Sequence, residues 1–217
     1  MSKSLGVTTL LEADDPVDIF NGIGETEQIS GIVIANLAIN DLPRGACLGK
    51  ITKGSASVAA KTGGSTGNGV LTMDAITPVV QGAKVGVYTV RCNKAAAGGG
   101  TFEIKDPDGF MLTTVLVGAS FNNDLKFSIS AGTTDFIVGD GFDITLAAGS
   151  GQYALWNTAN TDGSQVLAGI LTDATDATVT AEKACMYVKG SFNKARLTAG
   201  HTIETGVYGM IIIKEGV

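Results

Sequence analysis

Several residue types are scarce in this chain of 217 residues, and their scarcity excludes several kinds of site. His201 is the single histidine, so a metal site built from several histidines is excluded. The cysteines, Cys47, Cys92 and Cys185, are odd in number and widely spaced, which indicates neither a disulfide framework nor a zinc site. We expect them to be buried thiols in a reducing compartment. The net charge of −6 and the lack of a Lys/Arg cluster disfavour a nucleic-acid partner.

Long apolar runs are also lacking. The longest candidates, GIVIANLAI and YGMIIIK, fall well short of the roughly 18 residues that a membrane span needs. The N-terminal MSKSLGVTTLLEADDP does not read as a secretory signal, because its apolar stretch is short and acidic residues follow at once. We therefore expect a protein with no membrane partner that is made and folded in the cytoplasm.

The remaining composition favours short strands joined by turns. With 44% hydrophobic residues the chain can bury a core, while 30 glycines and 6% aromatic residues argue against long helices. Between about residues 68 and 150, apolar and polar residues alternate with period two, as half-buried antiparallel strands require. The apolar phase contains Tyr88, Val90, Cys92, Phe102, Ile104, Leu125, Phe127, Ile129, Phe142, Ile144 and Leu146. This stretch has the size of a small sandwich with its own core.

The sandwich stretch lies between two Gly/Ser-rich segments, KTGGSTGNG and AAGSGQ, which are typical of linkers. We predict an inserted antiparallel β-sandwich domain at residues 61–150. Residues 14–60 and 151–217 then form one discontinuous β-rich domain, after an N-terminal arm at residues 1–13. The fold class is thus mainly β.

The outer domain shows a different pattern. RGACLGKITKG (44–54) and GQYALW (151–156) read as neighbouring strands that the insertion separates. Continuous apolar runs such as VLAGIL and ACMYVKG indicate strands buried on both faces. Two short helical turns are predicted as well, one with Asp15 as N-cap before Pro16 and one in SFNKARLTAG that stops at Gly200.

For each candidate catalytic, phosphate-binding or metal site, a structural role such as a turn explains the residues better. His201 has no nucleophile elbow or papain-type cysteine context beside it, so we interpret it as a polar residue at a turn or interface. KTGGSTGNG lacks the ending of a phosphate loop, and DPDG (106–109) reads as a turn. The acidic groups lack EF-hand spacing; they are Glu12, Asp14, Asp15 and Asp18, then Asp106 and Asp108, then Asp173 and Asp176. We predict that the protein is not an enzyme and that it binds no cofactor and no metal.

An ordered set of segments in the outer domain carries a resemblance. A strand like RGACLGKIT (44–52) is followed by a TDGS corner that leads to AGIL (156–171). An acidic stretch and the strand ACMYVKGSFN come next (173–193), and GMIIIKEGV (209–217) ends the chain. This order resembles the head decoration proteins of tailed bacteriophages, the family that includes the lambda capsid-stabilising protein. The inserted segment also looks like a β-sandwich domain found inside some phage decoration proteins.

The resemblance implies a homotrimer on local three-fold positions of the expanded capsid, at the outer surface of the phage head. Its partners would be the major capsid protein and itself, and it would hold capsid subunits together against internal DNA pressure. The alternative is an adhesive or glycan-binding virion module with the sandwich as its head. That alternative predicts exposed aromatic or Asn/Asp-rich loop tips clustered at one end.

Two groups of residues are candidate contacts. The arm residues are Val7, Thr8, Thr9, Leu10 and Leu11, which have strand-forming composition but no obvious partner strand. They would add a strand to a sheet edge of the capsid, or they are simply a frayed terminus. Tyr153 and Trp156 lie beside the NTANTDGS turn, where an oligomer or capsid contact and local packing are both open.

Overall fold

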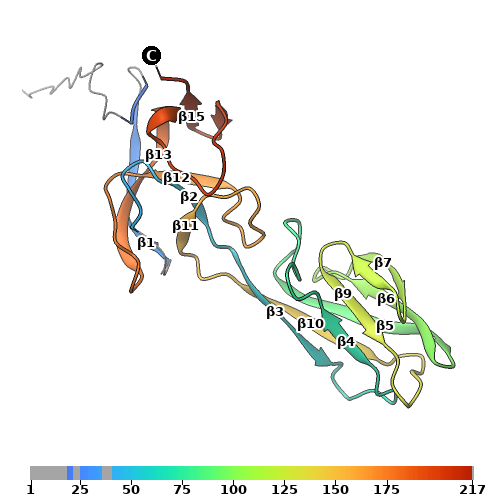
Figure 1. Ribbon diagram of the computed structural model, residues 1–217. Helices are drawn as coiled ribbons and strands as arrows, with labels where there is room; N and C mark the ends of the chain where they lie inside the picture. The colour runs from blue at the N-terminus through green and yellow to red at the C-terminus, as the bar shows by residue number, and fades with distance from the viewer. Residues whose placement is uncertain (1–18, 22–24, 36–40, 217) are drawn as a thin grey trace, which may run out of the picture. The chain divides into compact units, whose positions relative to one another are not determined.

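The computed structural model describes residues 19–21, 25–35 and 41–216, and it divides into two compact units. Unit 1 comprises the described residues up to Lys50, Gln152–Thr158, and the described residues from Val166 onward. Unit 2 comprises Ile51–Gly151 and Ala159–Gln165. Both units are built from strands (Figure 1), so the fold is mainly β, as predicted.

Unit 1 is a small barrel with a two-stranded extension. Strands β1, β11, β2, β12 and β13 pair in that order, and β13 pairs again with β1, which closes the barrel. The extension adds β15 and then β14 to the other part of β13. The strands are β1 (Glu27–Ile34), β2 (Cys47–Lys50), β11 (Tyr153–Leu155), β12 (Leu167–Leu171), β13 (Glu182–Asn193), β14 (Gly206–Tyr208) and β15 (Ile211–Lys214).

Successive residues of several strands in unit 1 enter two different hydrophobic clusters, because side chains alternate between the two faces of a strand. The pairs that divide in this way are Cys47 and Leu48, Ile170 and Leu171, and Met186 and Tyr187. VLAGIL and ACMYVKG are continuous apolar runs because these strands are buried on both faces. The prediction of burial on both faces is therefore confirmed.

Unit 2 is an antiparallel sandwich. A five-stranded sheet has the order β3-β10-β5-β6-β7, and a three-stranded sheet has the order β4-β9-β8. The strands are β3 (Lys53–Ala60), β4 (Val70–Met73), β5 (Gly86–Ala96), β6 (Gly99–Lys105), β7 (Met111–Leu116), β8 (Ser120–Asn122), β9 (Lys126–Ser130) and β10 (Gly141–Ala148).

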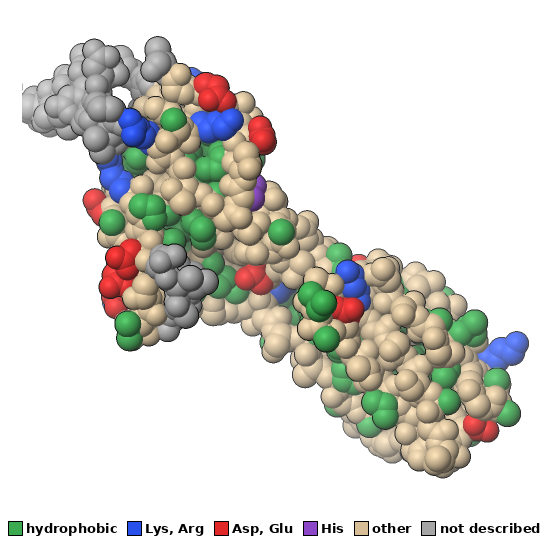
Figure 2. Space-filling model, viewed as in Figure 1, with side chains coloured by type: hydrophobic (Ala, Val, Ile, Leu, Met, Phe, Trp, Pro, Cys, Tyr) green, Lys and Arg blue, Asp and Glu red, His purple; other side chains and the backbone are tan. Residues whose placement is uncertain are grey.

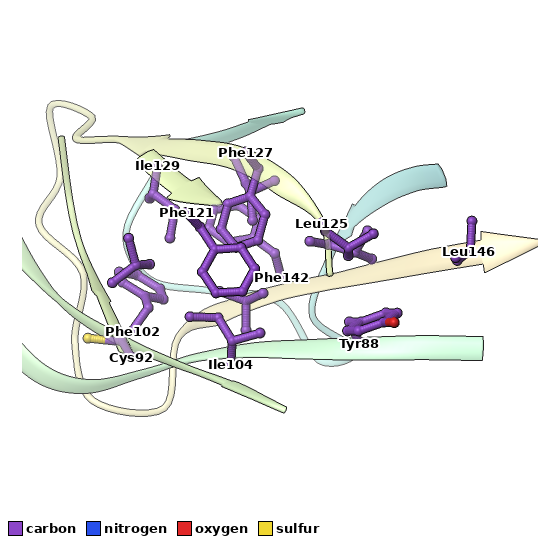
Figure 3. Close-up of a cluster of buried hydrophobic side chains, with 14 of the residues drawn as sticks. Tyr88, Cys92, Phe102, Ile104, Phe121, Leu125, Phe127, Ile129, Phe142 and Leu146 are labelled. Atoms are coloured by element: carbon purple, nitrogen blue, oxygen red, sulfur yellow. The ribbon is translucent and has the colours of Figure 1, made fainter. Parts of the chain in front are cut away.

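The period-two pattern placed the core of unit 2 correctly. Every residue assigned to the apolar phase between Tyr88 and Leu146 is buried in one cluster (Figure 3). Phe102 lies 4.9 Å from Phe136 between ring centroids, and Phe121 stacks on Phe127 at 4.7 Å. Phe121 and Phe127 are cross-strand partners within the three-stranded sheet, and the cluster joins them to residues of the five-stranded sheet in one core.

The boundary between the units differs from the one expected. The sequence placed residues 51–60 in the outer domain and treated 61–69 as a linker. In the structure β3 pairs along its length with β10, and the loop after it is fixed by Ser65, whose hydroxyl accepts from the N–H of Gly141 at 3.0 Å. The small residues of KGSASVAA give little amphipathic signal, so their membership in the sandwich is not visible in the sequence.

The TDGS corner also joins unit 2 rather than unit 1. The carbonyl oxygen of Asp162 accepts hydrogen bonds from the backbone N–H groups of Thr52 and Lys53, both at 2.8 Å. The side chain of Gln81 donates to the carbonyl oxygen of Asn160 at 3.2 Å. The corner is therefore held by the first residues of unit 2 and by the loop before β5.

The prediction that β2 and β11 are neighbouring strands is confirmed. Tyr153 and Lys50 are cross-strand partners in an antiparallel pair.

Only one of the two predicted helical turns lies in the described chain. Lys194–Arg196 forms a 3₁₀ turn, with the side chain of Asn193 accepting from the N–H of Ala195. The turn ends at Leu197, not at Gly200, because a 3₁₀ segment rarely exceeds one turn. The turn predicted at Asp15 and Pro16 lies outside the described residues. Within the described part of the chain, no helix is long and apolar enough to span a membrane.

The pairing of Lys50 with Tyr153 predicts where unit 2 can be removed. Deleting residues 52–150 should leave a soluble, folded unit 1, since the cut ends are already neighbours and a short connection suffices. Deleting residues 62–149 instead keeps β3 without its partner β10, which leaves an unpaired strand exposed. We expect the second protein to aggregate or to melt at a lower temperature, measured by size-exclusion chromatography and circular dichroism. The reverse ranking would contradict this boundary.

Candidate functional site

The arm residues predicted to contact the capsid, 7–11, lie outside the described residues, so their role stays a prediction. The first described residues, however, are firmly held on unit 1. Phe20 bridges to Phe192 in β13, and its ring packs edge-on against Tyr187 at 5.1 Å.

Ile19 stands beside the C-terminal end of the chain. Ile19 is buried, and its carbonyl oxygen accepts from the N–H of Asn193 at 2.8 Å. The N–H of Asn21 donates to the carbonyl oxygen of Ser191 at 2.9 Å, and its side-chain amide donates to the carbonyl oxygen of Glu215. One region of unit 1 therefore holds both the entry of the described chain and its last strand.

Trp156 is a core residue of unit 1. Its side chain is 3% exposed, and its ring meets His201 at 4.3 Å and Tyr208 at 5.2 Å, both edge to face. Its backbone N–H donates to Cys47, and its carbonyl oxygen accepts from Gly200, each at 2.8 Å. The geometry favours the local-packing interpretation of Trp156 over a contact with another molecule.

Tyr153 has a different environment. It is half-buried on β11 against the cluster that contains Leu48 and Leu171, and the Lys50 ammonium lies 6.0 Å from its ring. Part of the ring is thus available to a partner, and a contact role for Tyr153 stays a prediction.

A shallow depression of about 300 Å³ lies beside His201, rimmed by Leu197, Ala199 and Ile203. The imidazole packs against Trp156, and its Nδ1 is buried without a hydrogen-bond partner. A histidine that acts as a general base is normally oriented by a hydrogen bond to its second nitrogen. The arrangement gives no support to catalysis here.

The DPDG segment is a turn, as predicted. The carboxylate of Asp106 accepts from the N–H groups of Asp108 and Phe110 at 3.0 and 2.8 Å. The ammonium of Lys84 pairs with Asp106 and Asp108 at 2.7 and 2.6 Å. These bonds raise the pKa of Lys84, and the bond to Lys84 lowers the pKa of Asp106. Both carboxylates are satisfied by the protein itself.

No group of three or more His, Cys, Asp or Glu residues able to hold a metal ion occurs among residues 19–21, 25–35 and 41–216. Asp41 and Asp176 form a carboxyl pair, in which the hydrogen bond to Asp176 raises the pKa of Asp41. Hydrogen bonds from Thr178 lower the pKa of Asp176, so Asp41 is the member that holds a proton more readily.

The cysteines of the described chain are free. Cys47 and Cys92 are buried, as expected, and burial raises the pKa of the Cys47 thiol to about 12. A thiol with such a pKa stays protonated near neutral pH and is a poor nucleophile. Cys185 is only partly buried, which differs from the expectation.

The loops at the two ends of the sandwich test the glycan-binding alternative. Among the aromatic residues of unit 2, only Phe110 is strongly exposed, at 69%, in the turn between β6 and β7. The loops at the opposite end, 61–69 and 131–140, present glycines, threonines, the aliphatic side chains of Ile137 and Val138, and the exposed polar side chains of Asn68 and Asp135. Most of the surface of unit 2 seen in Figure 2 is uncharged. The described aromatic residues of unit 2 therefore form no exposed cluster at one end, and the Asn/Asp-rich form of the alternative stays a prediction.

A buried carboxylate fixes those opposite loops. Asp140 is 3% exposed and accepts from the backbone N–H groups of Thr66, Gly67 and Ile137 at 2.9, 2.8 and 3.0 Å. Burial raises the pKa of Asp140, but these three hydrogen bonds together lower it further, and the pKa lies below its ordinary value. The surrounding sequence, VGDG (138–141), gives no sign of this role.

Unit 1 is thus a β-barrel that holds the first described residues beside its last strand. The chain belongs to the bacteriophage lambda head decoration protein D family, whose model matches residues 24–207. This is a family of structural phage head proteins and not of enzymes. The protein is accordingly a capsid decoration protein of a phage virion.

Other comparisons add little. Two crystal structures of FlgL from Xanthomonas campestris are similar to part of this chain, with 23% and 24% identity and a TM-score of 0.32 each. They cover 48% and 49% of this chain, which spans only 33% and 32% of the FlgL chains. At that TM-score the likeness supports no argument about fold or function. Among curated proteins none matches.

The burial of Trp156 predicts a stability effect. Trp156→Ala should lower the free energy of unfolding of unit 1 by about 3–5 kcal/mol, because a large core side chain is lost and a cavity remains. Urea titration followed by circular dichroism measures this. A loss below about 1 kcal/mol, too small for a filled core position, together with lost capsid binding, would instead assign Trp156 to a contact surface.

The lowered pKa of Asp140 predicts a pH-dependent contribution to stability. Asp140→Asn should destabilise unit 2 by about 2–3 kcal/mol at neutral pH, since charge-assisted hydrogen bonds to buried N–H groups weaken. The wild-type advantage should persist above the unfolded pKa and disappear as pH falls through the lower folded pKa. Unfolding titrations of both proteins across the acidic range test this. A difference that stays constant with pH would contradict it.

Proposed function

We propose that this decoration protein binds the expanded phage capsid as a homotrimer and stabilises the shell against the pressure of packaged DNA. The observation that carries the proposal is the family match over residues 24–207, which includes all of unit 2 and most of unit 1. The three chain segments of unit 1 form a closed barrel, as expected for a rigid body that sits on a shell.

The contact to the capsid is proposed to come from the arm, with Val7, Leu10 and Leu11 as its apolar side chains. Support comes from Ile19, which is buried and hydrogen-bonded beside the C-terminal strand, so the sequence before it is tethered to a fixed point of unit 1. An extended segment can satisfy its backbone groups by adding to an exposed sheet edge of the capsid.

A trimer lets weak arms act together. Three arms on one oligomer bind at high effective concentration after the first has engaged, so each arm needs to contribute only modest affinity. Many such contacts across capsid seams would add up to a shell that resists outward pressure.

Removing residues 1–13 tests the arm. The truncated protein should keep its fold and oligomeric state but lose most of its binding to expanded, undecorated capsids, measured by co-sedimentation. Leu10→Asp should reproduce the loss because a charge cannot enter an apolar strand-addition site without cost. Lys105→Ala, a change of an exposed residue that pairs only with its neighbour Glu103, is the control and should bind normally.

The stabilising role needs its own readout. A DNA-filled capsid should retain its DNA up to a higher temperature with the wild-type protein bound than without it. Undiminished binding by the truncated protein would move the contact to the body of unit 1. Binding without any gain in DNA retention would contradict the cement role.

A further inference from the structure

The hairpin of β14 and β15 presents an exposed apolar surface. Val207 and Ile212 are cross-strand partners and are 71% and 37% exposed. Met210, in the turn between the strands, is 57% exposed. We call these three residues the hairpin patch. The family match ends at residue 207, within β14.

The hairpin patch is rigidly supported from beneath. Ile211 and Ile213 alternate with Ile212 along β15 and are buried in the core of unit 1. Tyr208 packs on Trp156, and its hydroxyl donates to the carbonyl oxygen of Glu204 at 3.2 Å. An apolar surface on a preorganised support loses little conformational entropy when it is covered.

β14 is also an open sheet edge within the described chain. It pairs with β15 and is the last strand in the order of its sheet. Its sequence, GVY, contains no charge and no proline, so only the three-residue length of the strand limits this edge. The exposed apolar side chains of the hairpin patch beside the edge indicate a surface that is covered in the working assembly.

The charges around the hairpin patch favour a second copy of the chain as its cover. Each copy carries a net charge of −6, so copies repel each other on average. Around the hairpin, Lys194 pairs with Glu215, and Lys214 and Glu204 supply one further charge of each sign. Figure 2 shows acidic and basic side chains intermixed on the part of unit 1 around β15. Copies can approach here without the repulsion that acts elsewhere.

We infer that the hairpin patches of neighbouring copies pack against one another around the symmetry axis of the oligomer. This inference rests on the proposed homotrimer and names the surface that forms it. The hairpin patch would be the centre of that contact, because each copy contributes the same residues around the axis.

The test uses the full-length protein and light scattering over a range of concentrations. Val207→Asp and Ile212→Asp should each raise the concentration at which half of the trimer dissociates by about tenfold or more, as expected for a charge placed in an interface centre. Val70→Asp is the matched control: Val70 is a valine of similar exposure, 58%, on strand β4 of unit 2, and its variant should remain trimeric. Circular dichroism and thermal melting confirm that each variant is folded.

Should an aspartate variant fail to fold, the double variant Val207→Thr and Ile212→Thr keeps the β-branched shape and should still dissociate at a higher concentration than wild type. Aspartate and threonine variants that stay trimeric at all concentrations would overturn the inference and leave the trimer intact. Variants that stay trimeric but lose capsid binding would show that the patch faces the capsid, which also overturns it. A wild-type protein that forms hairpin-dependent trimers yet ignores expanded capsids would contradict the proposed function and support the inference.

Discussion

The pairing of β2 with β11 is the constraint on which the rest of the molecule depends. Lys50 and Tyr153 are cross-strand partners, although nearly all of unit 2 lies between them in the chain. The barrel of unit 1 can close only if both strands meet, so unit 2 must begin and end at one place. Because loop-closure cost grows slowly with length, an antiparallel sandwich can occupy that place without disrupting the barrel.

The sequence predicts the sandwich core well because half-buried strands show a direct period-two signal, as in Phe102 and Ile104 or Phe142 and Ile144. It predicts β3 poorly because Ser, Ala and Gly side chains carry little information about which face is buried. The role of Asp140 could not be predicted, since its donors Thr66 and Gly67 come from a loop distant in sequence.

For the candidate contact residues, too, the sequence alone could not show which side chains are buried and which are exposed. Trp156 was expected near a turn, and only the fold shows that His201 and Tyr208 enclose it. Two residues of the hairpin patch, Met210 and Ile212, lie inside the run GMIIIK, in which buried and exposed isoleucines alternate and cannot be told apart by sequence. Membership in the decoration protein family gives the role of the chain, whereas the placement of its apolar surfaces proposes how that role is carried out.

We propose that unit 1 attaches three copies of this chain to the capsid around one axis. Electron microscopy of expanded capsids saturated with the full-length protein would show the copies directly. We expect three copies at each local three-fold position, with the barrel of unit 1 on the shell and the hairpins of β14 and β15 next to the axis. Isolated single copies, or attachment through the sandwich of unit 2, would contradict it.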